Sequence, residues 1–111
     1  MLEAPHFTGS GAAFVSRRHG STATVAVRGE VDLANASEFG QVLDALTGAG
    51  ARFVVLDLSA TTFFDASGLG IVATRAAGLE HLGGALTVRA PSPHLERLFE
   101  ITGLSGVIRI Q

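Results

Sequence analysis

Hydrophobic and polar positions along the chain follow two alternating periods, which predict strands interleaved with helices. Short segments whose apolar residues run together or alternate with polar ones predict strands at 12–15, 22–28, 53–58, 85–89 and 107–110. Apolar residues three or four positions apart predict helices between Asn35 and Gly48, between Asp65 and Gly83, and between Ser92 and Gly103. This order predicts an α/β protein of the α+β kind: a mixed sheet of four to five strands, with helices packed mainly on one face.

Polar and glycine residues mark the ends of these elements. Asn35 followed by Glu38 resembles a capping arrangement for the first helix. Ser92 followed by Pro93 is a typical start of the third helix. Residues 17–21 predict a turn, and residues 1–10 predict a loose tail because they are polar and contain Pro5. The 111 residues leave room for one domain, which spans 1–111.

Composition narrows the class of protein. The chain is 47% hydrophobic and 16% charged, as a compact globular domain is. The net charge is -2 and no cluster of arginines stands out along the sequence, so we expect no nucleic-acid partner. No apolar run approaches the ~20 residues needed to cross a membrane. The N-terminus lacks the basic and apolar regions of a signal peptide, so we expect a cytoplasmic protein without direct membrane insertion.

The sequence contains no recognisable catalytic or metal-binding arrangement. Cysteine is absent, which excludes thiolate chemistry, disulfides and Cys-based zinc sites. The histidines lack neighbours at metal-ligand spacing; they are His6, His19, His81 and His94. There is no Gly-x-Ser-x-Gly elbow and no phosphate loop of the Gly-Lys-Ser/Thr kind. We therefore expect no cofactor, no metal and no catalysis.

The stretch from residue 52 to residue 71 carries the candidate chemistry. A buried strand gives way to a short polar excursion, and a helix begins around Ala66, Ser67 and Gly68. The N-terminus of a helix has backbone N–H groups without partners and partial positive charge, so it can hold a phosphate. Two interpretations are open. Asp65 caps the helix and Ser67 is only a small residue in its first turn, or Ser67 is a phosphorylation site beside Asp65.

Three segments resemble STAS domains, specifically the bacterial anti-sigma factor antagonists. FFDASGLG, at 63–70, resembles the central motif of that family. The segment Gly29-Glu30-Val31-Asp32 resembles a second family segment, and 92–104, from Ser-Pro to Gly-Leu, resembles a third. The resemblance spans 22–110 and implies the STAS fold. Many members continue into a final helix after the last strand, and this sequence stops at that strand.

The resemblance also implies a function. Family members bind an anti-sigma factor and so free a sigma factor. The anti-sigma factor is usually a serine kinase that phosphorylates the antagonist at the central motif, and a serine phosphatase restores the active form. The usual acceptor position is Ala66 here, and Ser67 matches the second hydroxyl position. Either Ser67 accepts the phosphate or the protein binds constitutively; Thr61 and Thr62 are weaker candidates.

The implied partner-binding surface lies around the central motif. It comprises Glu30, Asp32, Phe64, Asp65, Ala66, Ser67, Gly68 and Leu69. Two other functions stay open for a small STAS protein. It could be a subunit of a membrane lipid-transport ABC complex, or a scaffold component of a stress-signalling assembly. The closeness of the central motif to that of the antagonists favours the anti-sigma factor antagonist.

Overall fold

The computed structural model describes residues 2–7 and 11–111, with side chains described from residue 11 onward. Its strands form one six-stranded sheet in the order β1-β2-β3-β4-β5-β6. The strands are β1 (Leu2–Phe7), β2 (Ala12–His19), β3 (Thr22–Val31), β4 (Phe53–Phe64), β5 (Ala85–Arg89) and β6 (Arg109–Ile110). The helices are α1 (Ala36–Gly48), α2 (Ala66–His81), α3 (Pro93–Ile101) and the short 3₁₀ helix η1 (Leu104–Gly106).

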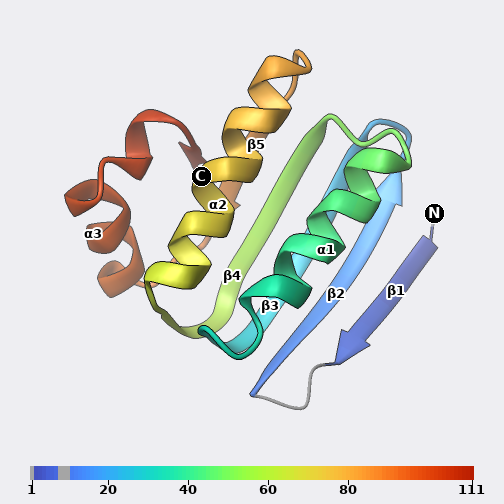
Figure 1. Cartoon of the computed structure of the whole chain (residues 1–111). Coiled ribbons are helices and arrows are strands. Elements are labelled where there is room, and N and C mark those ends of the chain that lie inside the picture. Colours follow the sequence, from blue (N-terminus) through green and yellow to red (C-terminus); the bar gives the residue numbers. More distant parts are fainter. Residues whose placement is uncertain (1, 8–10) are drawn as a thin grey trace.

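Helices and sheet form two layers. The first three strands pair antiparallel and the last four pair parallel, so the sheet is mixed as expected. Helices α1 and α2 lie side by side across one face of the sheet, with α3 beyond α2 (Figure 1). None of the helices in the described part of the chain is long and apolar enough to span a membrane.

The first strand corrects the expectation of a loose tail. Residues 2–7 pair antiparallel with β2, from Leu2 opposite Arg18 to Phe7 opposite Ala13. Pro5 fits this position because an edge strand does not need every backbone N–H for the sheet. The sheet therefore has one strand more than the sequence pattern indicated. The remaining residues of the predicted tail, 1 and 8–10, lie outside the described residues.

The turn expected at 17–21 is shorter than predicted. Strand β2 continues through His19, which pairs with Thr22 of β3, so the connection is Gly20-Ser21 alone. Gly20 has a φ of 63°, a conformation that glycine adopts without strain. Arg17 and Arg18 stay in the strand because their long side chains can reach solvent from a sheet surface.

Side chains that alternate along the strands fill the core under α1 and α2. Each central strand places every second residue, mostly an apolar one, on this face. Phe14 and Val25 are two of these residues, and both are fully buried. Three aromatic rings join the two layers. The Phe14 and Phe39 rings stack with centroids 5.3 Å apart, and Phe39 meets Phe64 edge to face at 5.9 Å.

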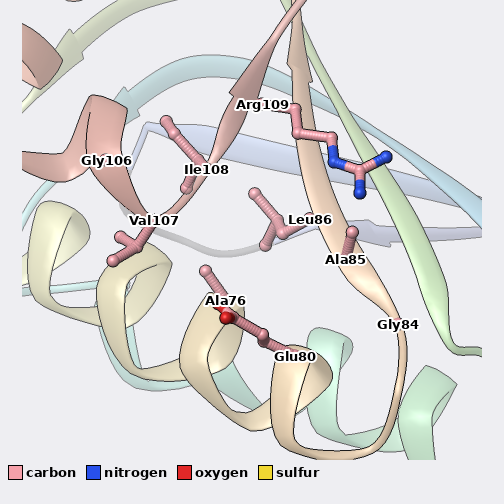
Figure 2. A pocket seen from close by; sticks show the side chains of 9 residues that line it. All are labelled: Ala76, Glu80, Gly84, Ala85, Leu86, Gly106, Val107, Ile108 and Arg109. Atoms are coloured by element: carbon pink, nitrogen blue, oxygen red, sulfur yellow. The ribbon is translucent and has the colours of Figure 1, made fainter.

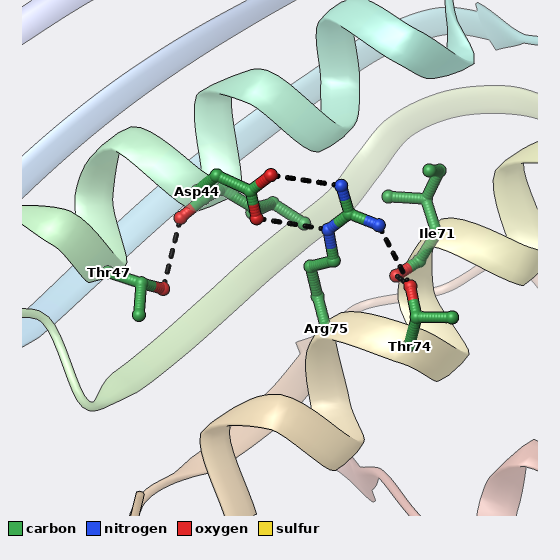
Figure 3. Close-up of polar contacts among 6 residues, drawn as sticks. Asp44, Thr47, Ile71, Thr74 and Arg75 are labelled. Carbon is green, nitrogen blue, oxygen red and sulfur yellow. Dashed lines mark hydrogen bonds and ion pairs between the residues drawn. The ribbon is translucent and has the colours of Figure 1, made fainter.

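An exposed ion pair links α1 to α2 on the outer surface. Arg75 Nε lies 3.1 Å from Asp44 Oδ1 and Arg75 Nη2 lies 3.0 Å from Asp44 Oδ2, as Figure 3 shows. Such exposed pairs contribute about 0–1 kcal/mol. The guanidinium also crosses over Gly40, where a Cβ would come within 2.8 Å of Arg75 Nη2. The pair thus orients the two helices more than it stabilises them.

Strand β4 is longer than predicted because two bulges carry it on to Phe64. Its pairing with β3 shifts between Ala26 and Arg28 and again between Gly29 and Glu30, and each shift adds one residue to β4. At the first bulge Asp57 Oδ1 accepts a hydrogen bond from Ser59 N at 3.0 Å. The buried Thr61 hydroxyl donates to Val27 O at 2.7 Å. Side chains therefore supply hydrogen bonds where the regular ladder is interrupted.

The last part of the chain is capped as predicted but ends differently. Ser92 caps α3, because its Oγ accepts a hydrogen bond from Leu95 N at 3.2 Å. The strand expected at 107–110 is reduced to Arg109–Ile110, because the backbone N–H groups of Val107 and Ile108 donate to Leu104 O, at 2.9 and 3.0 Å, and so close the turn of η1. A hollow of about 260 Å³ lies between α2 and this strand, with the core residues Leu86 and Ile108 at its base (Figure 2).

Candidate functional site

The predicted site residues gather at the carboxyl ends of β3 and β4. There the turn 32–35 that follows β3 lies beside the start of α2 (Figure 1). The backbone joins the two segments directly, because Asp65 N donates to Val31 O at 3.0 Å. The expectation that the loop carrying Glu30 and Asp32 lies next to the Ser67 segment is therefore confirmed in the structure.

Asp65 is the centre of this site. It occupies the N-cap of α2, and its Oδ1 accepts hydrogen bonds from Ser67 N at 2.8 Å and Gly68 N at 3.3 Å. Its other oxygen, Oδ2, accepts from Leu33 N at 3.1 Å. One carboxylate thus caps a helix and holds the neighbouring turn. The interpretation of Asp65 as the helix cap is confirmed, and the bond to Leu33 is an addition that the sequence did not indicate.

The backbone N–H groups of Ser67 and Gly68 at the start of α2 were expected to lack partners, but both donate to Asp65. Asp65 occupies the N–H groups of Ser67 and Gly68, and Leu69 N donates to Asp65 O at 3.0 Å. A phosphate on Ser67 would have to compete with the Asp65 carboxylate for those donors. It would also place negative charge beside a carboxylate, which is unfavourable. Phosphorylation of Ser67 would therefore disturb the capping of α2 by Asp65, instead of placing a phosphate on unoccupied N–H groups.

Asn35 was predicted to cap α1 with its side chain, but it has a different structural role. Its side chain makes no capping hydrogen bond to α1 and is fully buried. Its Oδ1 accepts from Asp32 N at 3.0 Å, and its Nδ2 donates to Glu30 O at 2.8 Å. Asn35 therefore braces the turn that precedes the helix, a role that asparagine side chains often take in turns. In the sequence, this role is indicated only by the spacing of Asn35, which lies three positions after Asp32.

Ala66 and Ser67 differ in accessibility. Ala66, the first residue of α2, is exposed, whereas Ser67 is half-buried. The family's usual acceptor position is thus the more accessible of the two, and it carries no hydroxyl. Of the weaker candidates, Thr61 is buried with its hydroxyl bonded to Val27, which removes it as an acceptor in this structure. Thr62 is exposed, but it lies in β4 rather than in a loop.

Burial divides the predicted partner-binding residues. Glu30 is exposed and Asp32, Asp65 and Leu69 are half-buried. Phe64 and Gly68 are buried and cannot touch a partner here, which corrects their assignment.

Apolar residues at the surface of this site come from other positions. Phe63 is 42% exposed and Leu33 is 80% exposed, whereas Phe64 points into the core. Gly68 is needed for packing, since a Cβ there would come within 2.8 Å of Val31 Cγ1. The alternation along β4 could have distinguished Phe63 from Phe64, had the strand been expected to extend that far.

The described residues contain no group of three or more His, Asp or Glu side chains that could hold a metal ion. His19, His81 and His94 lie at the ends of three different elements. The backbone of His6 belongs to β1, and its side chain lies outside the described part of the chain.

Known proteins resemble this chain in sequence and in fold. The family model described as "Mlab, STAS domain" matches residues 14–110. A protein of Bordetella bronchiseptica named as the anti-sigma factor antagonist BtrV is 32% identical over 84 residues, which cover 76% of this chain and 72% of that protein. The anti-sigma-B factor antagonist of Staphylococcus aureus is 30% identical over 86 residues, 78% of this chain and 80% of that protein.

A solved structure agrees with these sequence matches. The crystal structure of an anti-sigma factor antagonist from Mycobacterium paratuberculosis matches with a TM-score of 0.81 at 26% identity, over 93% of this chain and 87% of that chain. The arrangement of the strands and helices is therefore shared with that structure. The chain belongs to the STAS domain family, among the anti-sigma factor antagonists.

Proposed function

We propose that this protein binds an anti-sigma factor and thereby frees a sigma factor. The names of its relatives support this proposal. The observation that carries it is that two exposed apolar side chains, Leu33 and Phe63, lie on the segments that meet at Asp65 and are held there by hydrogen bonds. The function needs binding and no catalysis, and because sigma factors act in the cytoplasm we propose that location.

Leu33 is the expected anchor of the interface. Leu33 is 80% exposed, so its side chain contributes almost nothing to the core and its apolar surface is accessible to a partner. Its backbone is held by Asp65, and the turn that carries it is braced by Asn35. A side chain on a segment that is already ordered loses little conformational freedom on binding, which favours affinity. Glu30 and Asp32 would form the polar rim.

Control by phosphorylation at Ser67 is the finer part of the proposal. An anti-sigma factor with serine kinase activity would modify Ser67, and a serine phosphatase would reverse it. The phosphate would compete with the Asp65 carboxylate for the N–H groups of Ser67 and Gly68. If Asp65 shifts, its bond to Leu33 is lost and the anchor is no longer held. Because the usual acceptor position is Ala66, constitutive binding is the alternative to this switch.

A pull-down of the full chain from its own cells, with and without ATP, tests both parts by mass spectrometry. Recovery of an anti-sigma factor supports the function. Loss of that protein on adding ATP, together with phosphate on Ser67, supports the switch, whereas recovery unaffected by ATP leaves a constitutive antagonist. Recovery of lipid-transport ATPase subunits, or of a stress-signalling assembly without an anti-sigma factor, would overturn the function.

Calorimetry with the recovered partner then tests the surface. Leu33→Asp should weaken binding at least about tenfold, because it places a charge at the centre of the interface. Leu82→Asp is the matched control: Leu82 is 49% exposed at the opposite end of α2 and its change should leave affinity intact. Ser67→Glu should weaken binding and Ser67→Ala should not. Equal affinity for Leu33→Asp and the unmodified chain would remove Leu33 from the interface.

A further inference from the structure

Helices α1 and α2 cover one face of the sheet, and no helix in the described part of the chain covers the opposite face (Figure 1). A hollow of about 390 Å³ lies over the middle of β2–β5. Ala26 pairs in register with Asp57, and Asp57 pairs in register with Arg89, so these three form one row across the sheet. Ala26 has a small side chain, so the hollow is deepest there. Its register partner on β2 is Val15, and longer side chains surround both residues.

Charge is unevenly distributed around this hollow. Three arginines, Arg17, Arg28 and Arg89, are among the residues that line it, together with the acidic residue Asp57. The whole chain has a net charge of -2, whereas Arg28 and Arg89 outnumber Asp57 among the residues that line this hollow. Arg17 and Arg28 come from the hairpin of β2 and β3, whereas Arg89 comes from β5, which is far from that hairpin in sequence and is brought near it by the sheet.

Asp57 is held as an anion in the hollow. Hydrogen bonds from the Ser59 backbone and side chain lower the pKa of Asp57 below its usual 3.8, and the positive charges of Arg89 and Arg28 lower it further. At neutral pH the carboxylate is therefore ionised, and it offsets only one of the positive charges nearby. Arg89 has a neutral neighbour on its other side, where Nε lies 3.5 Å from Gln111 Oε1.

We propose that this hollow binds a small phosphate-bearing anion between Arg28 and Arg89. Guanidinium groups present paired N–H donors that match phosphate oxygens, and two such groups on different strands can hold one doubly charged ligand. The volume lies in the range of small-molecule sites rather than of a protein interface. A second copy of the chain is disfavoured, because its positive face would meet another positive face. The site is separate from Leu33 and the start of α2.

Isothermal calorimetry of the full chain with inorganic pyrophosphate at low ionic strength tests the site. Saturable binding at one site is expected. Arg28→Gln and Arg89→Gln should each weaken it about tenfold or more, because each removes a charge-assisted contact. Arg97→Gln on α3 changes the net charge equally and should bind as the unmodified chain does. Circular dichroism checks that every variant is folded.

Two further variants separate a built site from general charge attraction. Asp57→Asn should bind pyrophosphate several-fold more tightly, since the competing anion is removed, and a misfolded variant cannot produce that gain. Ala26→Leu should weaken binding without any change in charge, because it fills the hollow. The proposal is overturned by an absence of saturable binding, by an equal loss in Arg97→Gln, or by unchanged affinity in Ala26→Leu. Tighter binding of an acidic peptide than of pyrophosphate would assign this face to a protein partner instead.

Discussion

The starts of α1 and α2 look alike in sequence and are built differently. Each helix follows a parallel strand and has an Asx residue at its N-cap position, Asn35 for α1 and Asp65 for α2. Asp65 has an extended backbone (ψ of -174°) and its carboxylate turns forward to the first turn of its own helix. Asn35 has a ψ of 1°, and its side chain turns back to the strand and turn before it.

Burial explains the difference. Asn35 is fully buried, where an amide can satisfy a donor and an acceptor at once without the cost of an ionised group. Asp65 is half-buried, so its charge stays partly hydrated while it accepts several N–H bonds. The comparison teaches that the residue at an N-cap position shows where a helix begins, but its surroundings decide which backbone groups it serves.

Removal of the Asn35 side chain should have the largest effect on stability. Asn35→Ala leaves Asp32 N and Glu30 O without their partners, and we expect a loss of about 2–4 kcal/mol in the free energy of unfolding, measured by urea denaturation. Ser37→Ala is the control, because Ser37 is exposed in the first turn of the same helix and should change stability by no more than ~0.5 kcal/mol. Similar effects for both variants would contradict the bracing role.

A pair of glycines on α2 tests how closely that helix start packs on β3. Gly68→Ala should cost about 1–3 kcal/mol, because its Cβ would lie 2.8 Å from Val31 Cγ1 and 3.0 Å from Phe64 Cδ2 in the core. Gly70→Ala meets nothing within 4 Å and should instead stabilise by up to ~1 kcal/mol. Thermal melts of the two variants should therefore shift in opposite directions; a shared direction would mean that packing against Val31 does not decide the residue at position 68.

Asp65 should show the smallest effect of the three on stability and the most local one. Asp65→Ala loses the cap and the bond to Leu33, and we expect a loss of about 1–2 kcal/mol. Hydrogen exchange at Leu33 N should become faster while the interior amides of α1 keep their protection. Asp65→Asn keeps one acceptor oxygen, which can cap α2, but its Nδ2 cannot accept from Leu33 N, so we expect a loss smaller than that of Asp65→Ala together with the same faster exchange at Leu33 N. If Asp65→Asn were as unstable as Asp65→Ala, an uncharged acceptor would not suffice to cap α2, and the charge of Asp65 would be the important property.

Local patterns predicted much of the fold. The strand β5 has the predicted ends, and Ser92 and Asp65 cap α3 and α2, because these features depend on neighbouring residues in the chain. The first strand was missed because its stability comes from pairing with β2, which no local pattern reports. The extension of β4 was missed for a similar reason: polar residues between 57 and 62 suggested a loop, whereas the bulges keep them in the sheet.

The candidate site was predicted as a place more accurately than as a set of contacts. Asp65 and the turn containing Asp32 do meet, as the family resemblance implied. The sequence could not show that Phe64 is buried and Phe63 exposed, or that Asp65 already occupies the helix donors. The positive hollow around Arg28 and Arg89 was likewise invisible, since a cluster built from separate strands leaves no run of charge in the sequence.

The two bulges of β4 also bear on how this segment can vary in length. Its inward residues beyond the first four positions are Leu58, Thr61 and Phe64, three apart rather than two, because one extra residue lies in each interval. Loss of Ser59 would restore simple alternation between Leu58 and Thr61, and loss of Thr62 would restore it between Thr61 and Phe64. Either loss would leave Phe64 inside and Phe63 outside. Loss of a residue between Val54 and Leu58 would turn the residues after it to the wrong face. Homologous chains should therefore gain or lose residues at the bulges, and alignments across this strand should place their gaps there.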